Sequence, residues 1–183
     1  MAEKIISDEQ IAILKSKIRD VENFPKEGIV FKDITTLLND YESLNLVIES
    51  AYQFFKDKNI DFVAGIDSRG FIFGTPLALK LGVGFVPIRK KNKLPAETYS
   101  VTYDLEYGTD TLEIHKDAFL NKDSRILLVD DLLATGGTAS ASIDLIEKTG
   151  SKAVYTLFLI NLLFLNGEEK LKNKTDVISL LDF

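Results

Sequence analysis

Apolar residues along the chain follow two spacings, one typical of helices and one typical of buried strands. Residues 7–21 (SDEQIAILKSKIRDV) place apolar side chains along one helical stripe, at Ile11, Leu14, Ile18 and Val21. Ser7 precedes Gln10 by the three positions of a capping box, which marks the start of a helix. The pattern predicts an amphipathic N-terminal helix over these residues.

Five short apolar runs further along the chain have the length and composition of buried strands. They are FVAGID (62–67), GFVPIR (84–89), ILLV (126–129), AVYTLFLIN (153–161) and VISLL (177–181). Helical patterns separate them at about 44–58, at 71–82 and at 138–149, and Pro76 is tolerable in the second helix only near its first turn. Alternating residues predict a hairpin over 98–115 that projects from the sheet. Strands alternating with helices predict an α/β fold with a mostly parallel central sheet flanked by helices.

The length, net charge and amino-acid composition of the chain reduce the number of possible functions. The 183 residues suit one domain, and their net charge of −6 disfavours broad binding to nucleic acid. Neither a signal peptide nor a membrane-spanning apolar run is found, so we expect a cytoplasmic protein without a membrane partner. The absence of cysteine and the single histidine, His115, exclude thiol nucleophiles and histidine-rich metal sites. We interpret His115 as a strand-end residue.

Two adjacent carboxylates, Asp130 and Asp131, directly follow the apolar run at 126–129 and precede a Thr-Gly-Gly-Thr turn. The turn and the predicted helix behind it offer unpaired backbone N–H groups to a phosphate, through Ala134, Thr135, Gly136, Gly137 and Thr138. A plain strand-to-helix turn is the alternative. Because carboxylates accept hydrogen bonds from vicinal hydroxyls, the combination predicts a sugar phosphate. A P-loop nucleoside triphosphatase is disfavoured because Phe71 replaces the lysine that its motif requires.

Positive charge follows two other predicted strands, in GIDSRG and in IRKKNK. Ligands in parallel sheets lie outside the carboxyl ends of the strands, where these segments and the paired aspartates would meet. A second polyanion there would be bound by Ser68, Arg69, Gly70, Arg89, Lys90 and Lys93. A solvated basic loop and a structural ion pair of Arg69 are the alternatives. A sugar 5-phosphate beside a second polyanion describes phosphoribosyl pyrophosphate.

The stretch ILLVDDLLATGGTA resembles the phosphoribosyl pyrophosphate signature of the type I phosphoribosyltransferases. The stretches FPKEGIVFKDIT, GIDSRGFIFG, GVGFVPIRKKNKLP and YDLEYGTDTLEIHKDA extend the resemblance from about Phe24 to Gly167, toward members of that family that use adenine. The resemblance implies one domain over residues 1–183, with a small N-terminal hood, about residues 1–40, that binds the base. It also implies that adenine displaces pyrophosphate to give AMP.

The resemblance further implies roles for individual residues. Glu106 matches the catalytic glutamate, and a cis peptide would join Asp67 to Ser68. Adenine would contact four residues, Val30, Phe31, Lys32 and Leu162. Lys32 stands where arginine is common in the family, so it keeps the charge without the planar guanidinium. Mg²⁺ would bind mainly through the sugar pyrophosphate, with no residue assigned as a metal ligand, and the protein would be a homodimer.

Two alternatives to adenine transfer follow from the same signature. A transferase for hypoxanthine, guanine or xanthine is disfavoured by Glu106 in YDLEYG and by the segment IVFKD. A regulator that senses the sugar pyrophosphate while binding DNA would be expected to carry a basic DNA-binding module. The N-terminal residues carry both signs of charge, and only about 20 of them precede the hood segment FPKEGIVFKDIT. These two features disfavour the DNA-binding regulator.

Overall fold

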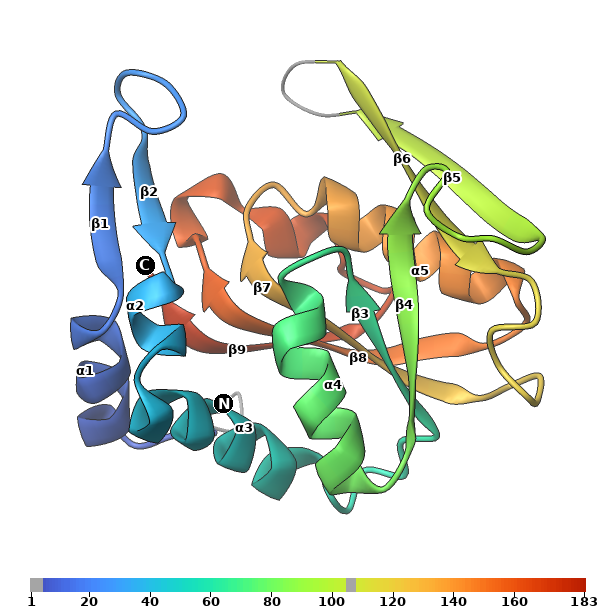
Figure 1. The fold of residues 1–183 in the computed structure, drawn as a ribbon, viewed down its shortest axis with the longest axis horizontal. Helices are drawn as coiled ribbons and strands as arrows, with labels where there is room; N and C mark the ends of the chain where they lie inside the picture. The colour runs from blue at the N-terminus through green and yellow to red at the C-terminus, as the bar shows by residue number, and fades with distance from the viewer. Residues whose placement is uncertain (1–4, 105–107) are drawn as a thin grey trace. The chain divides into compact units, whose positions relative to one another are not determined.

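A computed structural model describes residues 5–104 and 108–183 (Figure 1). The chain divides into two compact units, with the boundary between Phe54 and Phe55. Each unit has its own secondary structure, and the long sheet belongs entirely to the second. None of the helices in the described ranges combines the length and the apolar character that crossing a bilayer requires.

The first unit pairs a short hairpin with helices. Its elements are α1 (Asp8–Ser16), β1 (Arg19–Glu22), β2 (Val30–Asp33), α2 (Thr35–Leu38) and α3 (Tyr41–Phe55), the last of which ends one residue beyond the boundary. The capping box is confirmed: the Gln10 N–H donates to Ser7 Oγ at 3.2 Å, and the Ser7 N–H donates to Gln10 Oε1 at 2.9 Å.

The predicted extent of the first helix is wrong, because α1 ends at Ser16 and residues 19–22 form β1. β1 pairs antiparallel with β2, and Lys32 Nζ on β2 lies 2.7 Å from Asp20 Oδ1 on β1. Arg19 forms a second ion pair across the hairpin, with Asp33. Hydrogen bonds from Thr35 and Arg19 lower the pKa of Asp33 to about 2, so this pair stays charged at neutral pH.

The second unit is built on a seven-stranded sheet in the order β5-β6-β4-β3-β7-β8-β9. The strands are β3 (Phe62–Ile66), β4 (Gly84–Lys90), β5 (Thr98–Asp104), β6 (Thr109–His115), β7 (Arg125–Leu133), β8 (Lys152–Asn161) and β9 (Asp176–Asp182). Five neighbouring strands of this order, β4-β3-β7-β8-β9, are parallel, as predicted. The predicted hairpin is β5 and β6, which pair antiparallel and join β4 through two residue pairs.

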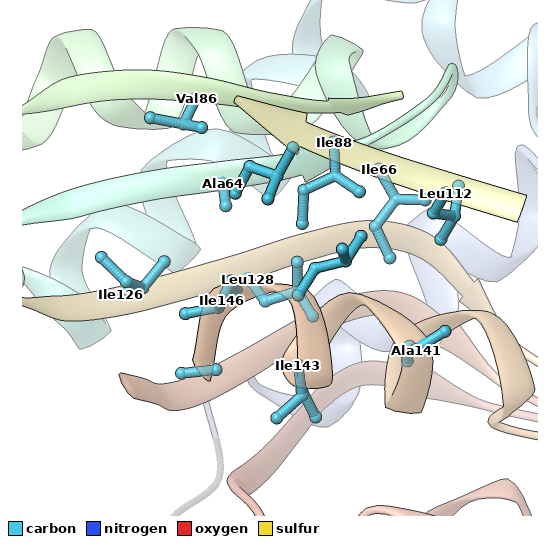
Figure 2. Packing of buried hydrophobic residues seen from close by; sticks show 14 of the residues in the cluster. Ala64, Ile66, Val86, Ile88, Leu112, Ile126, Leu128, Ala141, Ile143 and Ile146 are labelled. Carbon is cyan, nitrogen blue, oxygen red and sulfur yellow. The ribbon is translucent and has the colours of Figure 1, made fainter. Parts of the chain in front are cut away.

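Helices cover both faces of this sheet. Consecutive strand residues point to opposite sides, so the apolar strands present side chains to the helices on each face. On one face, α4 (Gly70–Leu81) packs its Gly74 against Val63 and Phe85. On the other face, α5 (Gly137–Lys148) packs its apolar side chains against the alternate strand residues (Figure 2). These strand residues include Ala64, Ile66, Val86, Ile88, Ile126 and Leu128. This core holds the carboxyl ends of β3, β4 and β7 in fixed positions.

Two predictions about element boundaries are corrected by the structure. β7 continues through Asp130 and Asp131 to Leu133, because its residues beyond Val129 still pair with β8, up to Leu133 opposite Asn161. Pro76 lies inside α4 rather than in its first turn. Proline at this position removes one helical hydrogen-bond donor, which the rest of the helix tolerates.

Candidate active site

A cavity of about 320 Å³ opens over the carboxyl ends of β3, β4 and β7, within the second unit. Its walls come from the ends of these strands, from residues 67–69 before α4, from the loop before α5 with the start of that helix, and from the hairpin. The lining residues are Ile66, Asp67, Ser68, Arg69, Lys90, Tyr103, Asp110, Leu112, Asp130, Asp131, Leu132, Leu133, Ala134, Thr135, Gly136, Thr138, Ala139 and Phe158. This is the edge of the sheet where the sequence placed the ligand.

The two carboxylates at the end of β7 both line the cavity. Asp131 is only 3% exposed, and its Oδ2 lies 2.9 Å from Nε of Arg69. The Asp131 N–H donates to Asp130 Oδ1 at 2.9 Å. Burial raises the pKa of both carboxyls, and the charge of Asp131 raises that of Asp130 further. A ligand that brings hydroxyl donors or positive charge to this pair would favour its ionised form.

The segment 134–138, here called the phosphate loop, forms part of the cavity wall. Gly136 has φ +77°, a left-handed conformation that side chains rarely adopt, and α5 begins at the next residue. The Gly136 carbonyl accepts from the Ser140 N–H at 2.9 Å, so the loop is continuous with the first turn of α5. Every residue of the loop except Gly137 lines the cavity in the described part of the chain.

The cationic side of the cavity is formed by Ser68, Arg69 and Lys90. The peptide between Asp67 and Ser68 is cis, as the family resemblance implied. Lys90 Nζ lies 3.3 Å from Oδ2 of Asp110, so this ammonium, like the guanidinium of Arg69, already has a carboxylate partner.

Three residues predicted to bind pyrophosphate, Gly70, Arg89 and Lys93, are absent from the cavity lining in the described ranges. Gly70 packs against β7, where an added Cβ would lie 2.5 Å from the Val129 carbonyl oxygen. Arg89 points to the α4 face, where its guanidinium carbon lies 5.9 Å from the centre of the Phe71 ring. Its Nε donates to Asp67 Oδ2 at 3.0 Å. Lys93 is exposed beyond the end of β4.

Sequence reasoning missed two polar residues of the cavity, Tyr103 and Asp110. The Thr138 hydroxyl donates to the Tyr103 hydroxyl at 3.2 Å, which joins the hairpin to the phosphate loop. Burial raises the pKa of Tyr103, so its hydroxyl stays protonated at neutral pH. A signal for Tyr103 was available, since it begins the segment YDLEYG that carried the family resemblance.

The remaining predicted residues lie outside this cavity. Glu106, the predicted catalytic residue, falls outside the described residues. Val30, Phe31 and Lys32 lie on β2 of the first unit, whereas all the lining residues in the described ranges belong to the second. Leu162 follows β8, is half-buried, and donates its N–H to the Leu133 carbonyl at 3.0 Å. His115 ends β6, as predicted for a strand-end residue.

The arrangement offers three kinds of recognition in one cavity. Backbone N–H groups at the start of α5 suit a phosphate, two carboxylates suit hydroxyl donors, and Arg69 with Lys90 suits a second anion. None of these groups is a preformed nucleophile. The geometry favours a reaction that depends on positioning and charge stabilisation.

Comparison with known proteins agrees with this geometry. The model of the phosphoribosyl transferase domain family matches residues 33–182. An adenine phosphoribosyltransferase of Campylobacter jejuni is 55% identical over 180 residues, which are 98% of each chain. The crystal structure of the adenine phosphoribosyltransferase of Thermoanaerobacter pseudethanolicus is 50% identical, with a TM-score of 0.90, and covers 94% of this chain and 99% of its own. The Saccharomyces cerevisiae enzyme, solved with adenine and an imino-altritol bisphosphate, is 39% identical, with a TM-score of 0.89, and covers 96% and 100%.

Proposed function

The chain belongs to the adenine phosphoribosyltransferases of the phosphoribosyl transferase domain family, and we propose in detail how its residues carry out that reaction. The reaction transfers the 5-phosphoribosyl group from phosphoribosyl pyrophosphate to adenine. It yields AMP and pyrophosphate, and so recovers a free purine for the nucleotide pool.

One observation carries the assignment of the sugar site. The phosphate loop, the carboxylates of Asp130 and Asp131, and the cations of Arg69 and Lys90 line the same cavity. These groups match the three polar parts of phosphoribosyl pyrophosphate: the 5-phosphate, the ribose hydroxyls and the pyrophosphate. Thr135 and Thr138 add hydroxyls on the side of the 5-phosphate, where the N-terminus of α5 contributes its N–H groups.

The chemistry then follows from charge. The bond between C1 of the ribose and the pyrophosphate oxygen breaks, a bond from C1 to a ring nitrogen of adenine forms, and that nitrogen loses its proton. Positive charge develops on the ribose while negative charge grows on the leaving pyrophosphate. Arg69 and Lys90 stabilise the leaving group, and the carboxylates fix the ribose through its hydroxyls. We assign to Glu106 the exchange of the proton at the base.

Adenine is assigned to the hood residues Val30, Phe31 and Lys32, together with Leu162. Support comes from the exposed side chain of Val30 and from the half-buried ring of Phe31, which leave apolar surface on β2. The bound adenine in the yeast structure shows that a relative with this fold takes the base. Gly70, Arg89 and Lys93 are assigned only supporting roles near the pyrophosphate.

Magnesium fits this cavity, because Asp130 and Asp131 present carboxyl oxygen atoms, and a nearby cation would favour the ionised forms that burial disfavours. Those two residues would face the ion, which would be held mainly by the oxygens of the sugar pyrophosphate. When bound, it neutralises negative charge on the pyrophosphate.

We also propose a cytoplasmic homodimer. The absence of cysteine agrees with a reducing compartment.

An outward face of α4 exposes Leu79 to 78% and Ile72 to 39%. A second copy of the chain would bury this apolar surface.

The proposal is tested by measuring AMP formation from phosphoribosyl pyrophosphate, Mg²⁺ and adenine, with hypoxanthine and guanine in parallel. We expect turnover with adenine alone. Asp131→Ala should lower kcat/KM for the sugar pyrophosphate about a hundredfold, because it removes a buried hydrogen-bond acceptor and leaves Arg69 without this partner. The matched control is Asp57→Ala, a change of an exposed aspartate outside the cavity.

Three results would change the assignment. Preference for another base would be compatible with the proposed phosphate site but would contradict the assignment of adenine as the substrate. Binding of the sugar pyrophosphate without turnover of any base would favour a metabolite sensor. A folded Glu106→Gln variant with full activity would remove the proton-transfer role from Glu106.

A further inference from the structure

We propose that the 3-10 turn η2 (Gly167–Lys170) is a rigid backing that positions the phosphate loop, and that Gly167 and Glu168 are positioning residues for the phosphoribosyl group. The inference rests on the proposed function, because it assigns a role in binding the 5-phosphate. The cavity lining in the described ranges includes no residue of this turn. Its effect must therefore pass through the loop.

The first observation is the close approach of two backbones. A Cβ added to Gly167 would overlap the Ala134 carbonyl oxygen and would lie 3.1 Å from the Ala134 carbonyl carbon. A Cβ added to Gly136 would overlap the Gly167 carbonyl oxygen and would lie 3.3 Å from Cβ of Lys170. Two glycines, one in the loop and one in the turn, are therefore needed for this contact. Backbone approached by backbone has little freedom to shift.

The second observation is a hydrogen bond from a buried amide to the exposed Glu168, which fixes the turn to the sheet. Asn161, the last residue of β8, is 1% exposed, and its Nδ2 donates to Oε1 of Glu168 at 2.6 Å. Asn161 pairs with Leu133, the residue directly before the phosphate loop. The turn is thus anchored to the same strand pair from which the loop departs. Removing the acceptor would leave a buried amide unsatisfied.

The third observation ties the segment after the turn to α5. Lys174 Nζ donates to Ser140 Oγ at 2.9 Å and to Asp144 Oδ1 at 2.6 Å. Leu171, between the turn and Lys174, is fully buried. The segment from Gly167 to Lys174 therefore contacts the loop at one end and the helix at the other. The loop and the start of α5 are held against one fixed support.

This support matters because the phosphate is bound by backbone N–H groups, which cannot adjust by rotating a side chain. Their direction is set by the path of the backbone from Ala134 to Thr138. A shift of about 1 Å in a group that positions substrate can cost on the order of a hundredfold in rate. One methyl group at Gly167 would be enough to force such a shift, because the Ala134 carbonyl is in its way.

The test uses Gly167→Ala and measures the Kd for ribose 5-phosphate by calorimetry, with KM for both substrates in the AMP assay. We expect Kd and the KM for phosphoribosyl pyrophosphate to rise by about tenfold to a hundredfold, with KM for adenine changed less than about twofold. The control is Gly84→Ala, whose Cβ would crowd the Phe62 ring at 2.9 Å, at the end of β4 away from the cavity. This control should lower Tm without changing Kd or either of the two KM values.

A second pair of variants keeps the inference testable if Gly167→Ala does not fold. Glu168→Ala removes the acceptor of the Asn161 amide and should raise Kd about threefold to tenfold, whereas Glu168→Gln keeps an acceptor oxygen and should restore binding. A lower Tm with unchanged Kd in Gly167→Ala or Glu168→Ala would overturn the inference. Wild-type protein that binds ribose 5-phosphate but makes no AMP would overturn the proposed function, while the variant series would still decide the positioning role.

Discussion

The groups proposed to bind anions in the cavity are of two kinds. On the side of α5, the phosphate loop is built from backbone whose path is fixed by Gly136 and by the contact with Gly167. In another part of the lining, Arg69 before α4 and Lys90 at the end of β4 contribute side-chain charges that are 42% and 58% exposed, and each is paired with a carboxylate. One side is fixed in position, and the other is defined by charge.

This difference indicates how each side responds to substrate. Under the proposed function, the phosphate loop would bind a phosphate with little rearrangement, because it leads directly into the N-terminus of α5. Arg69 and Lys90 are paired with Asp131 and Asp110, so under the proposed function they would exchange these partners, wholly or in part, for the pyrophosphate. Changing one member of an exchangeable ion pair should cost less binding free energy than displacing a backbone that is fixed in position. We therefore expect mutations on the loop side to have the larger effects.

The largest effect is expected for Gly136→Ala. The new Cβ would overlap the Gly167 carbonyl oxygen at a residue with φ +77°, so kcat/KM for phosphoribosyl pyrophosphate should fall at least about a hundredfold. Gly82→Ala is the matched control, because Gly82 has φ +71° and no atom of the described residues lies within 4 Å of its added Cβ. Steady-state kinetics on both variants separate backbone strain from displacement of the loop. Equal losses in the two variants would break the comparison.

An intermediate effect is expected for Arg69→Gln. Loss of one exposed cation should raise KM for phosphoribosyl pyrophosphate about tenfold, since the charge is partly screened by solvent. The gap to wild type should narrow as salt is added, whereas that of Gly136→Ala should not. Lys116→Gln, which removes an exposed cation paired with Glu97 on the hairpin, is the control. A gap that is insensitive to salt would argue that Arg69 acts through geometry instead.

The smallest effect is expected on stability, for Asp130→Asn without substrate. Burial and the charge of Asp131 raise the pKa of Asp130, so between its ordinary value of 3.8 and its raised value the folded chain binds more protons than the unfolded chain. Stability is therefore lost as pH rises through this window. Asparagine has no such loss, so the variant should melt above wild type at pH 8, and the gap should close toward pH 4. Asp57→Asn serves as the control in the same melting series.

Much of the second unit could be predicted from sequence, because its strands are continuous apolar runs such as Ile126–Val129 between helical patterns. The boundaries were less accessible. Asp130 and Asp131 end the apolar run, yet β8 continues to pair beside them, and that pairing is not encoded locally. The same reason explains α1: the stripe through Val21 is helical in spacing, but residues 19–22 find a partner in β2.

The site was predicted by residue type more accurately than by direction. Asp131 and Arg69, far apart in sequence, were both placed at the correct edge, because strand ends of a parallel sheet meet there. Arg89 was grouped with Lys90, although neighbouring strand residues point to opposite faces. Applying that alternation to β4 would have sent Arg89 toward α4 and Asp67, as the structure shows.

The extension of β7 through the two aspartates also affects how fast the backbone of these residues moves. Groups in a loop sample many positions within nanoseconds to microseconds, whereas a paired central strand separates only when a large part of the sheet opens. Asp130 pairs with Phe158 of β8, one residue beyond the last pair of β7 with β3, and belongs to the slow class. Its backbone should therefore exchange hydrogen with solvent as slowly as the apolar core, and the proposed ribose site would keep its shape from one turnover to the next.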